Sequence, residues 1–147
     1  MSLRDGSAKM SKSDPSDMSR INLQDDADTI MKKIKKAKTD PEPLPREEAG
    51  LEGRAEALNL VTIYGALTGQ SVEAVLAENG GQGFGAFKPK LGEALVDTLT
   101  PISERFRALK QDRETLDAIL AKGAARARER GAPTLSAAYK ALGLVRS

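Results

Sequence analysis

The chain has 147 residues, of which 39% are hydrophobic and only 3% aromatic, and its net charge is +2. This length suits one domain of ordinary size whose core is built from Leu, Ala, Val and Ile, and an all-helical core fits that supply. The sequence has no cysteine, which excludes disulfides, and no histidine, which removes the commonest general base and metal ligand. No apolar run approaches the ~20 residues that span a bilayer and no signal peptide opens the chain, so we expect a cytoplasmic protein with no membrane contact.

The first predicted element is a loop with two lysines three residues apart. Lys9-Met10-Ser11-Lys12-Ser13 is followed by Asp14-Pro15-Ser16-Asp17, where the proline disfavours helix for the residue before it. Asp5-Gly6-Ser7 precedes the lysines and indicates a mobile flank. We expect residues 1–24 to form a flexible segment in which Met10 anchors the loop by apolar packing.

A short amphipathic helix is predicted from about residue 25 to 38. Acidic residues crowd its first turn and lysines its last, which matches the helix dipole. Its apolar stripe has helical spacing and consists of Ile30, Met31, Ile34 and Ala37. Five lysines lie between residues 32 and 38 without an acid; such a cluster can meet nucleic acid, although a solvated helix face is the commoner explanation.

The middle of the chain predicts a connector and two helices. Residues 39–53 hold three prolines and two glycines among charged residues, which favours an extended connector. The following stretch, which ends at Gly69, is apolar on all sides and predicts a core helix. Ser71 is expected to cap another short helix, which stops at Asn79-Gly80-Gly81.

A glycine-rich segment with two aromatics runs from Gly81 to Lys88. Glycines of this kind can hold phosphate, but no strand precedes them, so neither a P-loop nor a dinucleotide-binding fingerprint is supported. We expect a tight turn in which Phe84 and Phe87 cap a helical bundle.

The last part of the chain predicts three helices. A long helix from Pro89 carries one apolar seam and should kink at Pro101. The seam consists of Leu91, Leu95, Leu99, Ile102, Phe106 and Leu109. A second helix reaches Arg130 before Gly131-Ala132-Pro133 breaks it, and a third spans residues 134–142. No strand is predicted, so the expected fold class is all-α: a helical bundle over residues 25–147 preceded by the loop segment.

The lysine pentamer resembles the ATP-handling loop of class I aminoacyl-tRNA synthetases. When an amino acid is activated by ATP, negative charge accumulates on the departing pyrophosphate, and lysines that close on it late lower the barrier. We assign the main role to Lys12 and an assisting one to Lys9, while Ser11 and Ser13 fix the loop or a phosphate oxygen. The alternative is an exposed polar loop with chance lysines, because short motifs produce false positives.

Most of the chain resembles the C-terminal part of bacterial tryptophanyl-tRNA synthetases. The tyrosyl enzymes have a related loop, but the glycine-aromatic segment followed by the Pro101 helix is similar to the tryptophan branch. The resemblance is carried by the lysine pentamer with Asp14-Pro15, by Lys38-Thr39-Asp40, by Asn59-Leu60 to Tyr64 ahead of Leu67-Thr68-Gly69, by Gly83 to Lys88, and by Leu99 to Phe106.

This resemblance implies that Lys9, Met10, Ser11, Lys12 and Ser13 bind ATP and that Lys12 serves pyrophosphate release. It also implies that ATP with Mg²⁺, tryptophan and tRNA(Trp) are the partners of a parent enzyme, which is expected to be a homodimer, and that this chain itself binds no metal.

The helical domain, over residues 25–147, is implied to receive the tRNA anticodon. Anticodon bases are single-stranded and readable by arginine and aromatic side chains. Arg105, Arg107 and Lys110 are the candidates for this contact. For any one of them, an exposed solubilising charge is about as common an explanation.

One departure from the family matters for activity. Class I synthetases need a nucleotide-binding fold with a histidine-bearing signature ahead of this loop, and this sequence contains neither. We therefore expect the chain alone to be inactive in aminoacylation, as a segment of a tryptophan-tRNA ligase. The alternative is a freestanding helical RNA-binding or regulatory module, with an unspecific helical interaction domain third. The intact pentamer favours the ligase segment.

Overall fold

The computed structural model describes residues 1–144, and the predicted all-α class is confirmed, since no strand occurs in that range. The chain divides into two compact units, Met1–Glu104 and the residues from Arg105 onward. The predicted division after residue 24 stays a prediction about a parent enzyme. Over residues 1–144, no single helix has the length and apolarity to cross a membrane, and α2 and α3 reach that composition only as a pair bent by 103°.

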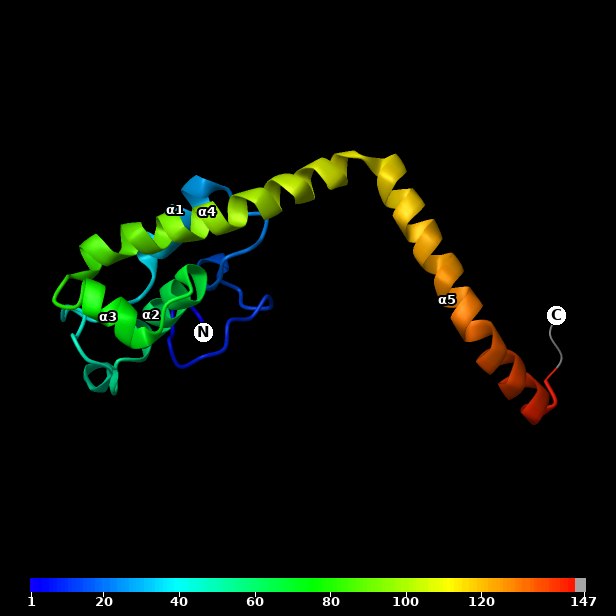
Figure 1. The fold of residues 1–147 in the computed structure, drawn as a ribbon, viewed down its shortest axis with the longest axis horizontal. Helices are drawn as coiled ribbons and strands as arrows, with labels where there is room; N and C mark the ends of the chain where they lie inside the picture. The colour runs from blue at the N-terminus through cyan, green and yellow to red at the C-terminus, as the bar shows by residue number, and fades with distance from the viewer. Residues whose placement is uncertain (145–147) are drawn as a thin grey trace. The chain divides into compact units, whose positions relative to one another are not determined.

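Within residues 1–144, five α-helices and two 3₁₀ turns follow one another (Figure 1). The helices are α1 (Ala27–Lys36), α2 (Ala55–Thr68), α3 (Val72–Asn79), α4 (Phe84–Gln111) and α5 (Arg113–Leu142), and the turns are η1 (Asp17–Ser19) and η2 (Glu48–Leu51). Their ends follow local chemistry. The Asp26 carboxylate caps α1 by accepting from Thr29 N at 2.8 Å, the Ser71 hydroxyl caps α3, and α2 ends at Gly69 with a φ of 71°.

The first unit holds the hydrophobic core, which α1 to α4 share. Phe87 is fully buried, and its ring meets Tyr64 edge-on at 5.4 Å between centroids. The Met31 side chain of α1 packs on the α4 backbone at Gly92, where a methyl group would overlap the methionine sulfur. The large aliphatic residues of the core are Leu3, Ile30, Ile34, Leu44, Leu51, Leu60, Val61, Val75, Leu76, Leu91 and Leu95.

The glycine-rich segment differs from its predicted form. Only Gly81 needs glycine for its backbone, with a φ of 86°, whereas α4 already begins at Phe84 and runs through Pro89. The reason is the apolar spacing: Phe84, Phe87, Leu91 and Leu95 are all buried and continue one helical face. Gly81 therefore lies in a turn, as predicted, whereas the segment from Phe84 onward is the first turn of a helix.

The predicted break at residues 131–133 was wrong, because α5 is continuous from Arg113 to Leu142. Alanines and arginines on both sides favour helix, and their summed propensity outweighs one missing proline hydrogen bond. The predicted seam of α4 is buried only in its first half, since Ile102 and Phe106 are 46% and 38% exposed.

The segment before the lysine loop is packed rather than mobile. Gly6 is buried where a methyl group would overlap the backbone of Ala55 at the start of α2. Leu3 is 2% exposed, and its backbone N–H donates to Ser19 O at 2.9 Å while its carbonyl accepts from Lys38 N at 2.8 Å. The expected mobility of Asp5-Gly6-Ser7 is therefore not found.

The segment after the lysine loop is held by a buried lysine of α1. The Lys33 side chain is 2% exposed, and its Nζ lies 2.6 Å from both Asp17 Oδ2 and Asp25 Oδ2. Asn22 completes the cluster by donating from Nδ2 to Asp17 Oδ1 at 2.9 Å and from its backbone to Asp25 Oδ2 at 2.9 Å. These contacts join η1 to α1.

The arrangement shifts the pKa of two groups in this cluster, Lys33 and Asp17. Burial alone would lower the pKa of Lys33, but hydrogen bonds to Asp17 and Asp25 outweigh it and raise the pKa above its usual value. The hydrogen bond from Lys33, followed by that from Asn22, lowers the pKa of Asp17. Lys33 is therefore charged, and the cluster is a genuine ion pair network.

We expect Lys33→Met to destabilise the chain, because it removes the cation that Asp17 and Asp25 share and leaves Asp17 ion-paired with Arg20 alone. Breaking a fully buried pair costs more, but Asp17 is 55% exposed, so we expect a loss of about 2 kcal/mol in the free energy of unfolding. Urea unfolding measures it as a lower midpoint with an unchanged m value.

Lys32→Met is the matched control, since Lys32 is the exposed neighbour on the same helix. It should change the free energy of unfolding by less than about 0.5 kcal/mol. Equal losses in the two variants would show that the carboxylate cluster contributes nothing specific.

Two ion pairs, Lys33–Asp17 in this cluster and Arg54–Asp40 outside it, predict how stability depends on pH. Hydrogen bonds from cations, Lys33 for Asp17 and Arg54 for Asp40, hold the pKa of both carboxyls below the usual 3.8. Their contribution is present above the unfolded pKa and is lost as pH falls through the folded pKa, so stability should drop from about pH 5 downward. In Lys33→Met the largest contribution to the lowered pKa of Asp17 is already absent, so the difference in unfolding free energy between variant and wild type should narrow toward pH 2. A difference that stays constant would contradict this assignment.

Candidate functional site

The lysine pentamer lies in a loop, as predicted. The loop is shaped by local side-chain bonds: Ser13 N donates to Ser11 Oγ at 3.2 Å, and Asp14 N donates to Ser11 O at 3.3 Å, which closes a turn around Lys12. Ser16 N then donates to Asp14 Oδ1 at 2.8 Å. The serine hydroxyl of the motif therefore fixes the loop's shape, one of the two roles expected for it.

The two lysines of the motif are presented to solvent. Lys9 and Lys12 are exposed, and neither forms an ion pair with any described residue. Met10 between them is half-buried and packs against the core, as expected for an apolar anchor. The loop thus holds two ammonium groups outward from one fixed point, an arrangement that suits a polyphosphate arriving from solvent.

Arg20 is a residue of this site that sequence reasoning missed. Its Nη1 donates to Asp14 O at 2.9 Å and, more weakly, to Ser11 O at 3.4 Å and Ser16 O at 3.5 Å. Its Nη2 pairs with Asp17 Oδ1 at 3.0 Å. One guanidinium therefore fastens the end of the loop to the Lys33 cluster. No motif marks it, because three of its partners are backbone carbonyls, which carry no sequence signal.

The front of the loop is fixed by an aspartate. Asp5 accepts from both the backbone N–H and the hydroxyl of Ser7, at 2.9 and 2.6 Å, and these bonds lower the pKa of Asp5. Ser2 N donates to Ala8 O at 2.8 Å. The loop thus leaves and rejoins the folded unit at two secured points, near residues 8 and 17.

The three candidate anticodon contacts belong to the second unit. Arg105, Arg107 and Lys110 are exposed on the last turns of α4. Lys110 also lines a cavity of about 370 Å³ with Arg113, Leu116 and Ile119. The cavity therefore places two cations beside exposed apolar surface. Unpaired RNA bases can stack on a guanidinium plane such as that of Arg113.

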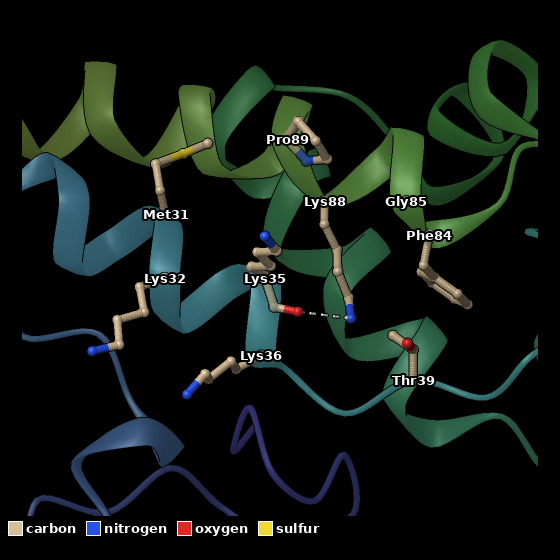
Figure 2. Close-up of a pocket in the computed structure, with 9 residues that line it drawn as sticks. All are labelled: Met31, Lys32, Lys35, Lys36, Thr39, Phe84, Gly85, Lys88 and Pro89. Atoms are coloured by element: carbon tan, nitrogen blue, oxygen red, sulfur yellow. Dashed lines mark hydrogen bonds between the residues drawn. The ribbon is translucent and has the colours of Figure 1, made fainter.

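A larger cavity, of about 1070 Å³, lies in the first unit between α1 and the start of α4 (Figure 2). We call it the α1/α4 groove. Its lining residues are Met31, Lys32, Lys35, Lys36, Thr39, Phe84, Gly85, Lys88 and Pro89. Sequence reasoning noticed the lysine run but favoured a solvated face, because the groove depends on where α4 begins.

The described part of the chain, residues 1–144, contains no group of three His, Cys, Asp or Glu side chains that could hold a metal ion.

Comparison with known proteins gives the family. The family model described as tRNA synthetases class I (W and Y) matches residues 1–100. The chain is 61% identical over 143 residues to a tryptophan–tRNA ligase of Caulobacter vibrioides, which covers 97% of this chain and 42% of that enzyme. It is 58% identical over 145 residues to the tryptophan–tRNA ligase of Rhizobium meliloti, and the alignment covers 99% of this chain and 41% of that enzyme. The chain therefore spans about two fifths of the length of these curated relatives.

A solved structure extends the similarity to the fold. The crystal structure of tryptophanyl-tRNA synthetase from Mycoplasma pneumoniae superimposes with a TM-score of 0.75 at 27% identity, over 99% of this chain and 45% of that one. Sequence and fold agree, and the chain belongs to the family of class I tRNA synthetases for tryptophan and tyrosine.

Proposed function

We propose that this chain supplies the ATP loop and the anticodon-binding helices of a tryptophan–tRNA ligase. The observation that carries the proposal is the intact lysine pentamer, displayed outward on a turn with secured ends, in a chain whose relatives at 61% and 58% identity are tryptophan–tRNA ligases. A loop that had lost its role would have no reason to keep both lysines exposed and unpaired.

In this proposal Lys12 acts on the leaving group. Attack of the tryptophan carboxylate on the α-phosphate of ATP breaks the bond to pyrophosphate, which leaves with the electron pair. The Lys12 ammonium stabilises the charge that develops there, and Lys9 assists from the other side of Met10. ATP enters as its magnesium complex. The adenosine and tryptophan pockets lie in the remainder of the ligase.

The remaining assignments follow from the same function. The helical part receives tRNA(Trp), with Arg105, Arg107 and Lys110 at the anticodon, because exposed guanidinium groups can stack on and hydrogen-bond unpaired bases. The parent enzyme is a homodimer and works in the cytoplasm, where translation consumes its product.

The second candidate is a freestanding helical RNA-binding or regulatory module. It is favoured by the composition of the second unit, which has ten basic residues and four acidic ones from Arg105 to the end of the chain. A module of this kind would bind tRNA but would not depend on Lys9 or Lys12.

We expect no tryptophan-dependent exchange of pyrophosphate into ATP from the 147-residue chain alone. A hybrid in which this chain replaces the matching segment of the Caulobacter vibrioides ligase should restore the exchange. In the hybrid, Lys12→Ala should lower kcat by about a hundredfold or more with a smaller change in KM, because the interaction is made in the transition state. Lys9→Ala should have a smaller effect in the same direction.

Lys122→Ala is the matched control in the hybrid, since Lys122 is an exposed lysine of α5 outside the loop. Its kcat should equal that of the unmodified hybrid. Adenylate formation by the chain alone, or an unchanged kcat in Lys12→Ala, would sink the assignment of the loop.

The anticodon assignment predicts a preference that depends on the bases. Arg105→Ala should weaken the binding of tRNA(Trp) by about tenfold and should abolish most of the preference over the same tRNA with an altered anticodon. Filter binding of both tRNAs at several salt concentrations measures this. Binding by the wild-type chain that falls steeply with salt and ignores the anticodon would argue against specific recognition.

A further inference from the structure

The five lysines between residues 32 and 38 divide into two groups in the structure. Lys33 is paired with Asp17 and Asp25, and Lys38 Nζ lies 2.7 Å from Glu56 Oε1. The other three are exposed, and within residues 1–144 no carboxylate forms an ion pair with any of them. They are Lys32, Lys35 and Lys36. The run is therefore not a uniform solvated face.

The unpaired lysines share one face of α1. Positions 32, 35 and 36 are related by steps of three and four, which places their Cβ atoms about 5–6 Å apart. Ile30, Lys33 and Ile34 occupy the opposite, buried face. In Figure 2, the ammonium groups of Lys32 and Lys36 extend along the outer side of α1, whereas that of Lys35 lies toward α4. All three residues line the α1/α4 groove, and the Lys35 ammonium is the one that lies toward α4.

Lys88 prepares the groove for an anion. Its Nζ donates to Ala37 O at 2.7 Å and to Lys35 O at 3.5 Å, the carbonyls at the C-terminal end of α1 (Figure 2). These carbonyls form the negative pole of the helix, which would repel phosphate if left bare. Burial lowers the pKa of Lys88. A phosphate beside Lys88 would meet cations in place of a negative helix end.

Helix stability offers a simpler account of the lysines, since cations near a helix C-terminus interact favourably with the dipole. However, Lys88 already satisfies this end of α1, and like charges at spacings of three and four repel each other by a few tenths of a kcal/mol. Three unpaired lysines beside a satisfied helix end add little to folding. A negatively charged ligand would explain their placement.

We propose that the α1/α4 groove binds the phosphate backbone of RNA, with Lys32, Lys35 and Lys36 as the cationic contacts. Three separate point charges on flexible stems suit a run of phosphates, and the groove wall of Met31 and Pro89 offers apolar surface to the sugar face of a strand. The contact is independent of sequence and lies outside both the lysine pentamer and the anticodon candidates. It rests on the proposed function only for the identity of the RNA as tRNA.

The test compares two charge-matched triple variants of the full 147-residue chain. One carries Lys32→Gln, Lys35→Gln and Lys36→Gln, and the other carries Lys122→Gln, Arg126→Gln and Arg130→Gln on one face of α5. Their tRNA affinities are measured from 50 to 300 mM salt. In the groove variant, affinity should fall by about tenfold or more at low salt, and the slope of log K against log salt should shrink by about 2. The α5 variant should change neither quantity by as much.

Four further measurements separate the outcomes: a Lys→Arg variant, circular dichroism, a tRNA with an altered anticodon, and competition by polyglutamate. A triple Lys→Arg variant of the groove should retain the wild-type slope, and circular dichroism should show wild-type helicity in all variants. The tRNA with an altered anticodon should lose as much affinity as tRNA(Trp) in the groove variant, because phosphates carry no sequence. Equal losses in the groove and α5 variants, an unchanged groove variant, or equal competition by polyglutamate of matched charge would overturn the groove assignment and leave the ligase assignment intact. Failure of the wild-type chain to bind tRNA at all would overturn the RNA-binding role proposed for the chain and the groove with it.

Discussion

The rest of the first unit depends on the ion pairs that the buried Lys33 ammonium forms with Asp17 and Asp25. Removing a lysine from water is costly, and only two carboxylates at 2.6 Å make that position stable. Asp17 brings the end of the lysine loop, and Asp25 brings the start of α1. Because α1 in turn meets α4 at Gly92 and through Lys88, one charge joins the loop, the helix and the groove wall.

The same network explains why the lysine run could not be interpreted from sequence. Lys33 and Lys38 differ from their neighbours only through partners that come from elsewhere in the chain, Asp17 before the helix and Glu56 at the start of α2. Periodicity places lysine 33 on the apolar face, since it falls between Ile30 and Ile34, and that is the one local sign of its burial. Local pattern thus separates the buried Lys33 from the groove lysines, but it does not mark Lys38 as paired or reveal which carboxylates pair.

Sequence rules worked where the deciding chemistry is local. Asp26, Ser71 and Gly69 ended or began helices as capping rules require, and the lysine loop stayed irregular beside Pro15. The same rules gave wrong predictions where packing against the core, or helix propensity summed over many residues, outweighed the local signal. The buried spacing of Phe84 and Phe87 pulled the glycine-rich segment into α4, and the helix propensity around Pro133 carried α5 through a breaker. The sequence predicts a mobile flank at Gly6, because no sequence pattern shows that Ala55 packs against it.

These anchors set the limits of any motion that brings the lysine pentamer to a polyphosphate. Gly6 is packed on α2, and Asp17 is bound to Lys33, so a closing movement that keeps both contacts is confined to roughly residues 9–16. Within that span Met10 is half-buried, which holds Lys9 nearer to the folded unit than Lys12. Lys12, at the centre of the turn between Ser11 and Asp14, has the greater reach. The geometry of the anchors, more than the motif itself, therefore gives a physical reason for assigning the leaving group to Lys12 rather than to Lys9.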